Sequence, residues 1–102
     1  IKVVRVAGAL EITYACKKIA EKEKPNAIIA LGVVIRGETT HYELVTETTY
    51  NGLMQVQLEN LTPIIFGIQT CENEQQAQER CAKDQMNKGS RAAISALIQT
   101  QI

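Results

Sequence analysis

Several residue types are scarce in this chain, and each shortage excludes a class of protein. There is no tryptophan, one phenylalanine (Phe66) and one histidine (His41) among the 102 residues. The three cysteines, Cys16, Cys71 and Cys81, lack CxxC spacing. With a single histidine they make a poor set of zinc ligands, so we expect no metal site. An odd number of cysteines without a disulfide pattern is typical of a reduced, cytoplasmic setting.

The chain also lacks an excess of either charge. Lys and Arg together number 11, as do Asp and Glu, so the formal net charge is zero. Proteins that wrap a nucleic-acid backbone or lie on an anionic membrane are usually basic, and this balance argues against both. No apolar run approaches the ~18 residues that a membrane-spanning helix needs. We therefore expect neither nucleic acid nor membrane as a partner.

What the chain does have is an alternation of strand-like and helix-like segments. It is 45% hydrophobic, a normal value for one globular domain over residues 1–102. Apolar alternation predicts a strand at residues 2–6. A continuous apolar run with β-branched residues predicts a strand buried on both faces at 27–35, and another short buried strand is predicted at 62–70. A helical stripe that includes Ile12, Cys16 and Ala20 predicts a helix at 9–24, and Asn73, with Gln76 three residues later, resembles the cap of a helix at 73–84. Helices are also predicted at 41–61 and 89–102. This order predicts an α/β fold in which a parallel sheet has helices on both faces, in three layers.

The segment GVVIRGETTHYELV, residues 32–45, lies where the second predicted strand ends. Ligands of open parallel sheets sit beyond the carboxyl ends of the strands. Residues 37–40 precede a helix that Thr40 and Glu43 would cap, so their backbone amides can bind an anion, with Thr39 as a further donor. His41 stands beside this turn, where an imidazole can transfer a proton. Judged from spacing alone, the alternatives are an ordinary capped turn and a surface histidine.

Four other side chains are candidates for the same site. Glu11 follows the first predicted strand and can accept hydrogen bonds from sugar-like hydroxyls, although a glutamate there also suits the helix dipole. Arg80 is the only arginine in its helix, and the alternative is a solvated helix charge. Phe66 either stacks on a ligand or belongs to the core or an interface. Arg36 either contacts a ligand or stabilises the turn.

Four segments in order carry a resemblance to a known family: VAGALEI, AIIALGVVIRGETTHYELV, PIIFGIQT and ERCAKDQMNKG. Together they resemble lumazine synthase (6,7-dimethyl-8-ribityllumazine synthase). The resemblance implies a flavodoxin-like fold without a cofactor, and a homo-oligomer that is a pentamer or a 60-subunit icosahedral shell. It implies the condensation of 5-amino-6-ribitylaminouracil with 3,4-dihydroxy-2-butanone 4-phosphate in riboflavin biosynthesis. It also implies a cytoplasmic protein, or a plastid one in a plant.

The resemblance also implies roles for individual residues. His41 matches the histidine assigned to proton transfer, and Arg80 matches the arginine that pairs with the substrate phosphate. The matches to substrate-binding positions are Glu38 and Thr39 in the phosphate loop, Glu11 at the ribityl hydroxyls, Val33, Val34 and Ile35 facing the pyrimidine, and Phe66, which approaches the ring from the adjacent subunit.

Two positions depart from the family pattern. Leu10 stands where the family has an aromatic residue that stacks on the pyrimidine, and leucine has no π-face. Asp84 stands where the family has a lysine, for which the adjacent Lys83 is a possible substitute. These departures leave open a rival interpretation, a cage or scaffold subunit of the same fold with weakened or lost catalysis. A flavin-binding flavodoxin-like domain is a third.

The resemblance begins at the family's second strand. In the family the first strand lies between the second and third strands of the sheet. We therefore expect the first strand and helix, missing from these 102 residues, to come from another chain or segment. Otherwise residues 2–6 and 27–35 would keep unpaired backbone groups where the sheet is buried.

Overall fold

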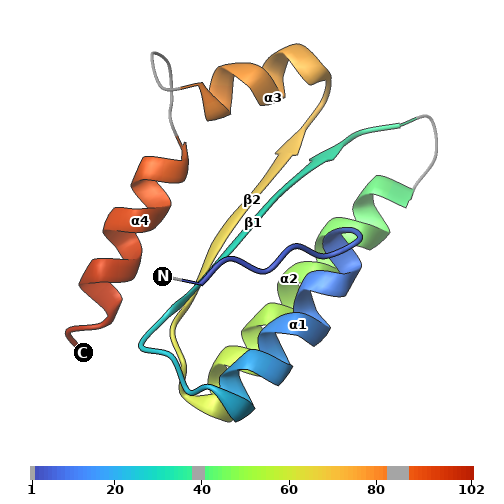
Figure 1. Ribbon diagram of the computed structural model, residues 1–102. Coiled ribbons are helices and arrows are strands. Elements are labelled where there is room, and N and C mark those ends of the chain that lie inside the picture. Colours follow the sequence, from blue (N-terminus) through green and yellow to red (C-terminus); the bar gives the residue numbers. More distant parts are fainter. Residues whose placement is uncertain (1, 38–40, 83–87) are drawn as a thin grey trace.

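A computed structural model of the chain describes all residues except 1, 38–40 and 83–87. In the described residues four helices surround a two-stranded parallel sheet (Figure 1). Their bounds in chain order are α1 Ala9–Lys22, β1 Ile28–Ile35, α2 His41–Asn60, β2 Ile64–Cys71, α3 Glu74–Cys81 and α4 Lys88–Gln99.

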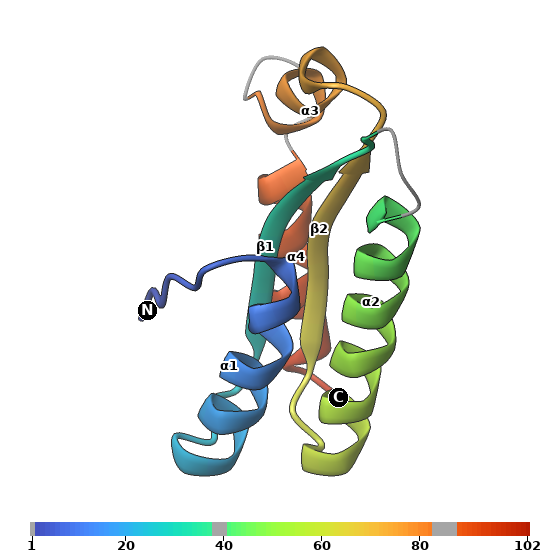
Figure 2. The ribbon, with the colours of Figure 1, turned by 90° about the vertical axis from the view of Figure 1, so that its right-hand side faces the viewer.

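The elements form three layers, as predicted. Helices α1 and α2 lie side by side on one face of the sheet, and α4 covers part of the other face (Figure 2). Helix α3 lies beyond the carboxyl ends of the two strands (Figure 1). The strands are parallel and in continuous register, from Ile28 beside Ile64 to Ile35 beside Cys71. Because the strands are parallel, their carboxyl ends meet at one end of the sheet.

The core lies between the sheet and the α1–α2 layer. Helix α1 contributes a stripe with a spacing of four residues, which is one face of a helix. Its members and their partners are Ile12, Cys16 and Ala20 from α1, Leu53 and Val56 from α2, and Ala30, Ile64 and Ile68 from the strands. Leu53 has no exposed surface. Burial of one such leucine stabilises the fold by about 1.5–3 kcal/mol.

Local signals account for several helix ends. The Asn73 side chain accepts a hydrogen bond from the Gln76 backbone N–H at 2.8 Å, which confirms the predicted cap of α3. The Gln76 amide oxygen in turn accepts from the Glu72 backbone N–H at 2.8 Å. Helix α1 stops at Lys22, two residues earlier than predicted, and Lys24 then takes a left-handed φ of 47°. The predicted cap residue Thr40 lies outside the described residues.

The predicted strand at residues 2–6 is wrong. These residues have no regular structure and run exposed beside α1, with the Lys2 ammonium paired to Glu23 at 2.9 Å. Val3 is 77% exposed. A strand requires a neighbour for its backbone hydrogen bonds, and in the described part of the chain residues 2–6 pair with neither β1 nor β2. The apolar alternation of residues 2–6 is therefore not enough by itself to form a strand.

The prediction that residues 27–35 are buried on both faces is also wrong. The even-numbered residues of β1 face α1 and α2 and are at least half covered. The odd-numbered ones are exposed by 40–62%: Ile29, Leu31, Val33 and Ile35. Helix α4 packs more closely on β2 than on β1, so this side of β1 is not covered by the described residues. The apolar run thus identifies a strand but not what covers it.

Candidate active site

The carboxyl end of the sheet is marked by one backbone hydrogen bond beyond the strands. The Arg36 N–H donates to the Cys71 carbonyl at 2.8 Å and extends the parallel ladder by one step. Polar side chains come to this end from three places: Arg36 directly after β1, Glu43 in the first turn of α2, and Arg80 in α3. This is the end at which ligands of open parallel sheets bind.

Arg80, in the last turn of α3, reaches back to the end of β2. Its Nη1 donates to the Thr70 carbonyl at 2.7 Å and contacts the Cys71 sulfur at 3.6 Å. The residue is half-buried, so it is not the fully solvated helix charge that spacing alone favoured. A guanidinium held in this way presents a fixed positive charge, the group that binds phosphate best.

Arg36 joins two carboxylates from different elements. Its Nη1 donates to Glu43 in the first turn of α2, and its Nε lies 3.0 Å from a Glu72 oxygen just after β2. Its guanidinium carbon also lies 4.6 Å from the centroid of the Tyr42 ring. The hydrogen bond with Glu43 contributes most to raising the pKa of Arg36. Arg36 therefore links the first turn of α2 to the segment after β2. Whether it also contacts a ligand stays one of the two predicted alternatives.

His41 is the first residue of α2 and is exposed at the same end of the molecule. Tyr42 and Glu43, the two residues after it, are both held by Arg36. Of the predicted phosphate loop, Glu38 and Thr39 lie outside the described residues. Lys83 and Asp84 lie outside them as well.

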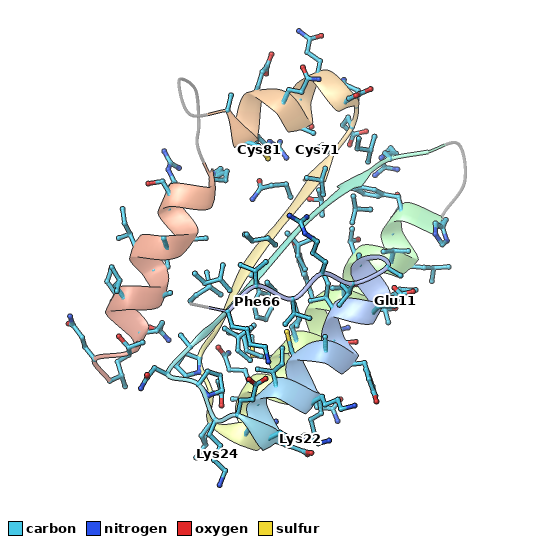
Figure 3. The ribbon with its side chains drawn as sticks, in the orientation of Figure 1. Glu11, Lys22, Lys24, Phe66, Cys71 and Cys81 are labelled. Atoms are coloured by element: carbon cyan, nitrogen blue, oxygen red, sulfur yellow. The ribbon has the colours of Figure 1, made fainter. Side chains whose placement is uncertain are left out.

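The two predicted residues of α1 lie in its first turn. Glu11 is exposed, and its backbone N–H donates to the Gly8 carbonyl at 3.2 Å. Leu10 is 44% exposed. Glu11 lines a groove of about 610 Å³ between the amino-terminal segment and α1. In Figure 3, Glu11 and Cys71 lie well apart, at the start of α1 and the end of β2. This chain alone does not bring Glu11 to Arg80.

The predicted strand residues divide between two faces. Val33 and Ile35 point to the less covered face, 47% and 43% exposed, whereas Val34 packs against the core. Phe66 is half-buried, with its ring centroid 5.8 Å from that of Tyr50. It precedes Cys71 by five residues, roughly 16 Å along a strand. It lines a different hollow, of about 410 Å³, between α2, β2 and α4.

A family model described as 6,7-dimethyl-8-ribityllumazine synthase matches residues 1–101. The chain belongs to this family. Two curated relatives carry the same name. One, from Leuconostoc mesenteroides, is 42% identical over 97 residues, which are 95% of this chain and 62% of that protein. Another, from Porphyromonas gingivalis, is 39% identical over 95 residues, 93% of this chain and 59% of that protein. The chain thus spans about three fifths of the length of these lumazine synthases.

In a protein of this family, the carboxyl end of the sheet is the candidate position for an active site. Of the residues assigned by resemblance, His41 begins α2 at this end and Arg80 contacts the end of β2. Glu11 lies in the first turn of α1, well apart from Cys71, and Phe66 lies further back along β2 (Figure 3). That Phe66 serves a neighbouring subunit stays a prediction, as do the other residue roles. In the described ranges no three His, Cys, Asp or Glu residues are placed to hold a metal ion. No helix among those residues is long and apolar enough to cross a membrane.

Sequence reasoning missed three participants at this end: Tyr42, Cys71 and Glu72. Glu72 had a usable signal, because a charged residue directly after a buried parallel strand lies at the ligand-binding end. Cys71 was considered as a metal ligand and not as a partner for Arg80. Tyr42 follows the histidine in the motif, but nothing in the sequence indicated that its ring would lie under a guanidinium.

Proposed function

We propose that the protein acts as a lumazine synthase, which condenses 5-amino-6-ribitylaminouracil with 3,4-dihydroxy-2-butanone 4-phosphate to give 6,7-dimethyl-8-ribityllumazine in riboflavin biosynthesis. The observation that carries the proposal is the half-buried guanidinium of Arg80, held at the carboxyl end of β2 by Thr70 in a chain of this family. A fixed guanidinium at that end suits a phosphorylated substrate.

The reaction requires few catalytic groups. The pyrimidine amine attacks the ketone to form an imine with loss of one water, inorganic phosphate leaves, and the ring closes with loss of a second water. Most of the rate comes from holding two small molecules together in a reactive geometry. Arg80 binds the phosphate group through the reaction and stabilises it as it leaves. His41 takes and returns protons at the carbons and nitrogens that change bonding.

We further propose that the active unit is a homo-oligomer, a pentamer or a larger shell. The exposed apolar side of β1 and the hollow beside Phe66 support this, because apolar surfaces of this kind are usually covered in an assembly. Native mass spectrometry separates the two sizes. A cytoplasmic location follows as part of the same proposal, and the three free thiols fit a reducing compartment.

The direct test is incubation with both substrates while the absorbance and fluorescence of the lumazine product are followed. We expect turnover by the wild type. A well-folded, assembled protein without turnover would refute the catalytic proposal and favour a scaffold role.

Arg80→Ala should raise the KM for the phosphorylated ketone roughly tenfold to a hundredfold, because hydrogen bonds to charged groups contribute about 1.5–3 kcal/mol. The KM for the pyrimidine should change much less. Arg91→Ala, at an exposed position on α4, is the matched control and should change neither. Equal effects of Arg80→Ala on both substrates would contradict phosphate binding.

His41→Ala should lower kcat by about 10²-fold if the imidazole transfers protons.

A further inference from the structure

The guanidinium of Arg36 connects the two sides of the carboxyl end. On one side it holds both residues that follow His41, with Glu43 in an ion pair and Tyr42 beneath its planar face. On the other side it pairs with Glu72, while its own backbone N–H binds the Cys71 carbonyl. One side chain thus contacts the first turn of α2 and the segment that follows β2.

Arg80 uses the same end of β2 as its support. Its Nη1 touches the Thr70 carbonyl and the Cys71 sulfur, so Cys71 is in contact with both arginines. Any shift of β2 relative to α2 would move Arg80 relative to His41. Among the described residues, Arg36 has ion pairs both with the first turn of α2 and with the segment that follows β2.

Stability is a poor explanation for this arrangement. The side chains of Arg36, Glu43 and Glu72 are 42%, 45% and 59% exposed. Exposed ion pairs contribute little to folding because water screens them and because ordering long side chains has an entropic cost. Geometry is the better explanation, since a planar guanidinium fixes the direction of each partner.

We propose that Arg36 is a positioning residue, which sets the place of His41 relative to Arg80 through its contacts with Tyr42, Glu43 and Glu72. The inference rests on the proposed function, because it assumes that His41 and Arg80 act on one substrate. The role assigned to Arg36 is to act through its neighbours, because its Nη1 and Nε face the two carboxylates.

The test compares Arg36→Lys with wild type. Lysine keeps the charge but has a single ammonium, which cannot reproduce the Nη1 and Nε directions or the stacking on Tyr42. We expect kcat to fall about ten- to a hundredfold, the loss that a small misplacement produces. Glu72→Ala removes the carboxylate that pairs with Arg36 Nε. The position is exposed, so this variant should fold normally and lower kcat in the same way. Arg91→Lys is the control for the substitution itself and should leave kcat unchanged.

A second measurement does not need turnover. His41 is the only histidine in the chain, so its ring Hε1 signal is identifiable in a proton NMR spectrum. Inorganic phosphate should shift this signal in the wild type and shift it much less in Arg36→Lys at the same pH and protein concentration. If wild type has no turnover but shows the phosphate-dependent shift, and Arg36→Lys largely loses it, the proposed function fails, whereas the positioning of His41 relative to a bound phosphate by Arg36 stands. If wild type turns over and both variants keep kcat within twofold, the positioning role is overturned and the function stands.

Discussion

Gly52 lies in the middle of α2 and allows that helix to approach α1 closely. A Cβ atom at this position would lie 2.7 Å from Cγ2 of Thr13 and 3.3 Å from its Cβ. Carbon atoms do not pack at 2.7 Å, so an alanine here must displace Thr13 or separate the helices. Thr13 is held by its Oγ1, which donates to the Leu10 carbonyl at 3.0 Å.

Two effects of Gly52→Ala oppose each other. Alanine raises helix propensity by about 1 kcal/mol relative to glycine, which would stabilise an isolated helix. Overpacking at the contact with Thr13 costs about 1–3 kcal/mol, because a β-branched side chain cannot withdraw by rotation alone. The second effect is larger, so we expect a net loss of about 1 kcal/mol in the free energy of unfolding.

Urea denaturation followed by far-ultraviolet circular dichroism measures this loss. With m values of about 1–3 kcal/mol/M, the midpoint should fall by roughly 0.3–1 M at constant protein concentration. The matched background is Thr13→Ser, which removes the methyl group at 2.7 Å and keeps the hydroxyl that binds Leu10. In that background Gly52→Ala should be neutral or stabilising. A higher midpoint for Gly52→Ala in the wild-type background would refute the reasoning, because it would mean that propensity outweighs the contact.

Two further predictions concern titratable groups. Cys81 is exposed and should react quickly with a thiol reagent at pH 8, and Cys81→Ser should remove this fast reaction. Cys16 and Cys71 are buried and should react only on unfolding. Burial also raises the pKa of the Cys16 thiol, which slows its reaction further. The pKa of Glu59 is lowered from its usual 4.5, and the largest cause is a hydrogen bond from Gln55. The Glu59 carboxylate therefore stabilises the fold above pH 4.5, and this stabilisation is lost as the pH falls through the lowered pKa. The stability difference between wild type and Glu59→Gln should therefore shrink in acid, and a difference that grows there would contradict the assignment.

Much of the fold could be predicted because its signals are local. The stripe of Ile12, Cys16 and Ala20 predicted α1, and Asn73 predicted the start of α3. The error at residues 2–6 has a physical cause, since a strand depends on a partner that its own sequence does not specify. The burial of β1 was predicted wrongly for the same reason. An apolar run indicates a strand, but it does not show whether another element covers each face of that strand.

The site could be predicted less well from the residues alone. Arg80 in isolation looked like a solvated charge, and only the family resemblance raised it to a phosphate ligand. The bridge made by Arg36 depends on strand register: β1 pairs each residue with the one 36 positions later, which places Arg36 beside Glu72. A register of this kind arises from tertiary packing and cannot be derived from either segment by itself.

That constant spacing also has a kinetic consequence during synthesis. Each residue of β1 waits for a partner 36 positions downstream, as with Ile28 and Ile64. At roughly 5–20 residues per second, the ribosome needs about 2–7 s to produce that partner. Until then the apolar segment of residues 28–35 leaves the ribosome without its neighbour, while α2 is already able to form. During this interval the apolar side chains and unpaired backbone groups of the segment are exposed, a condition that favours aggregation until the sheet closes and the carboxyl-end site forms with it.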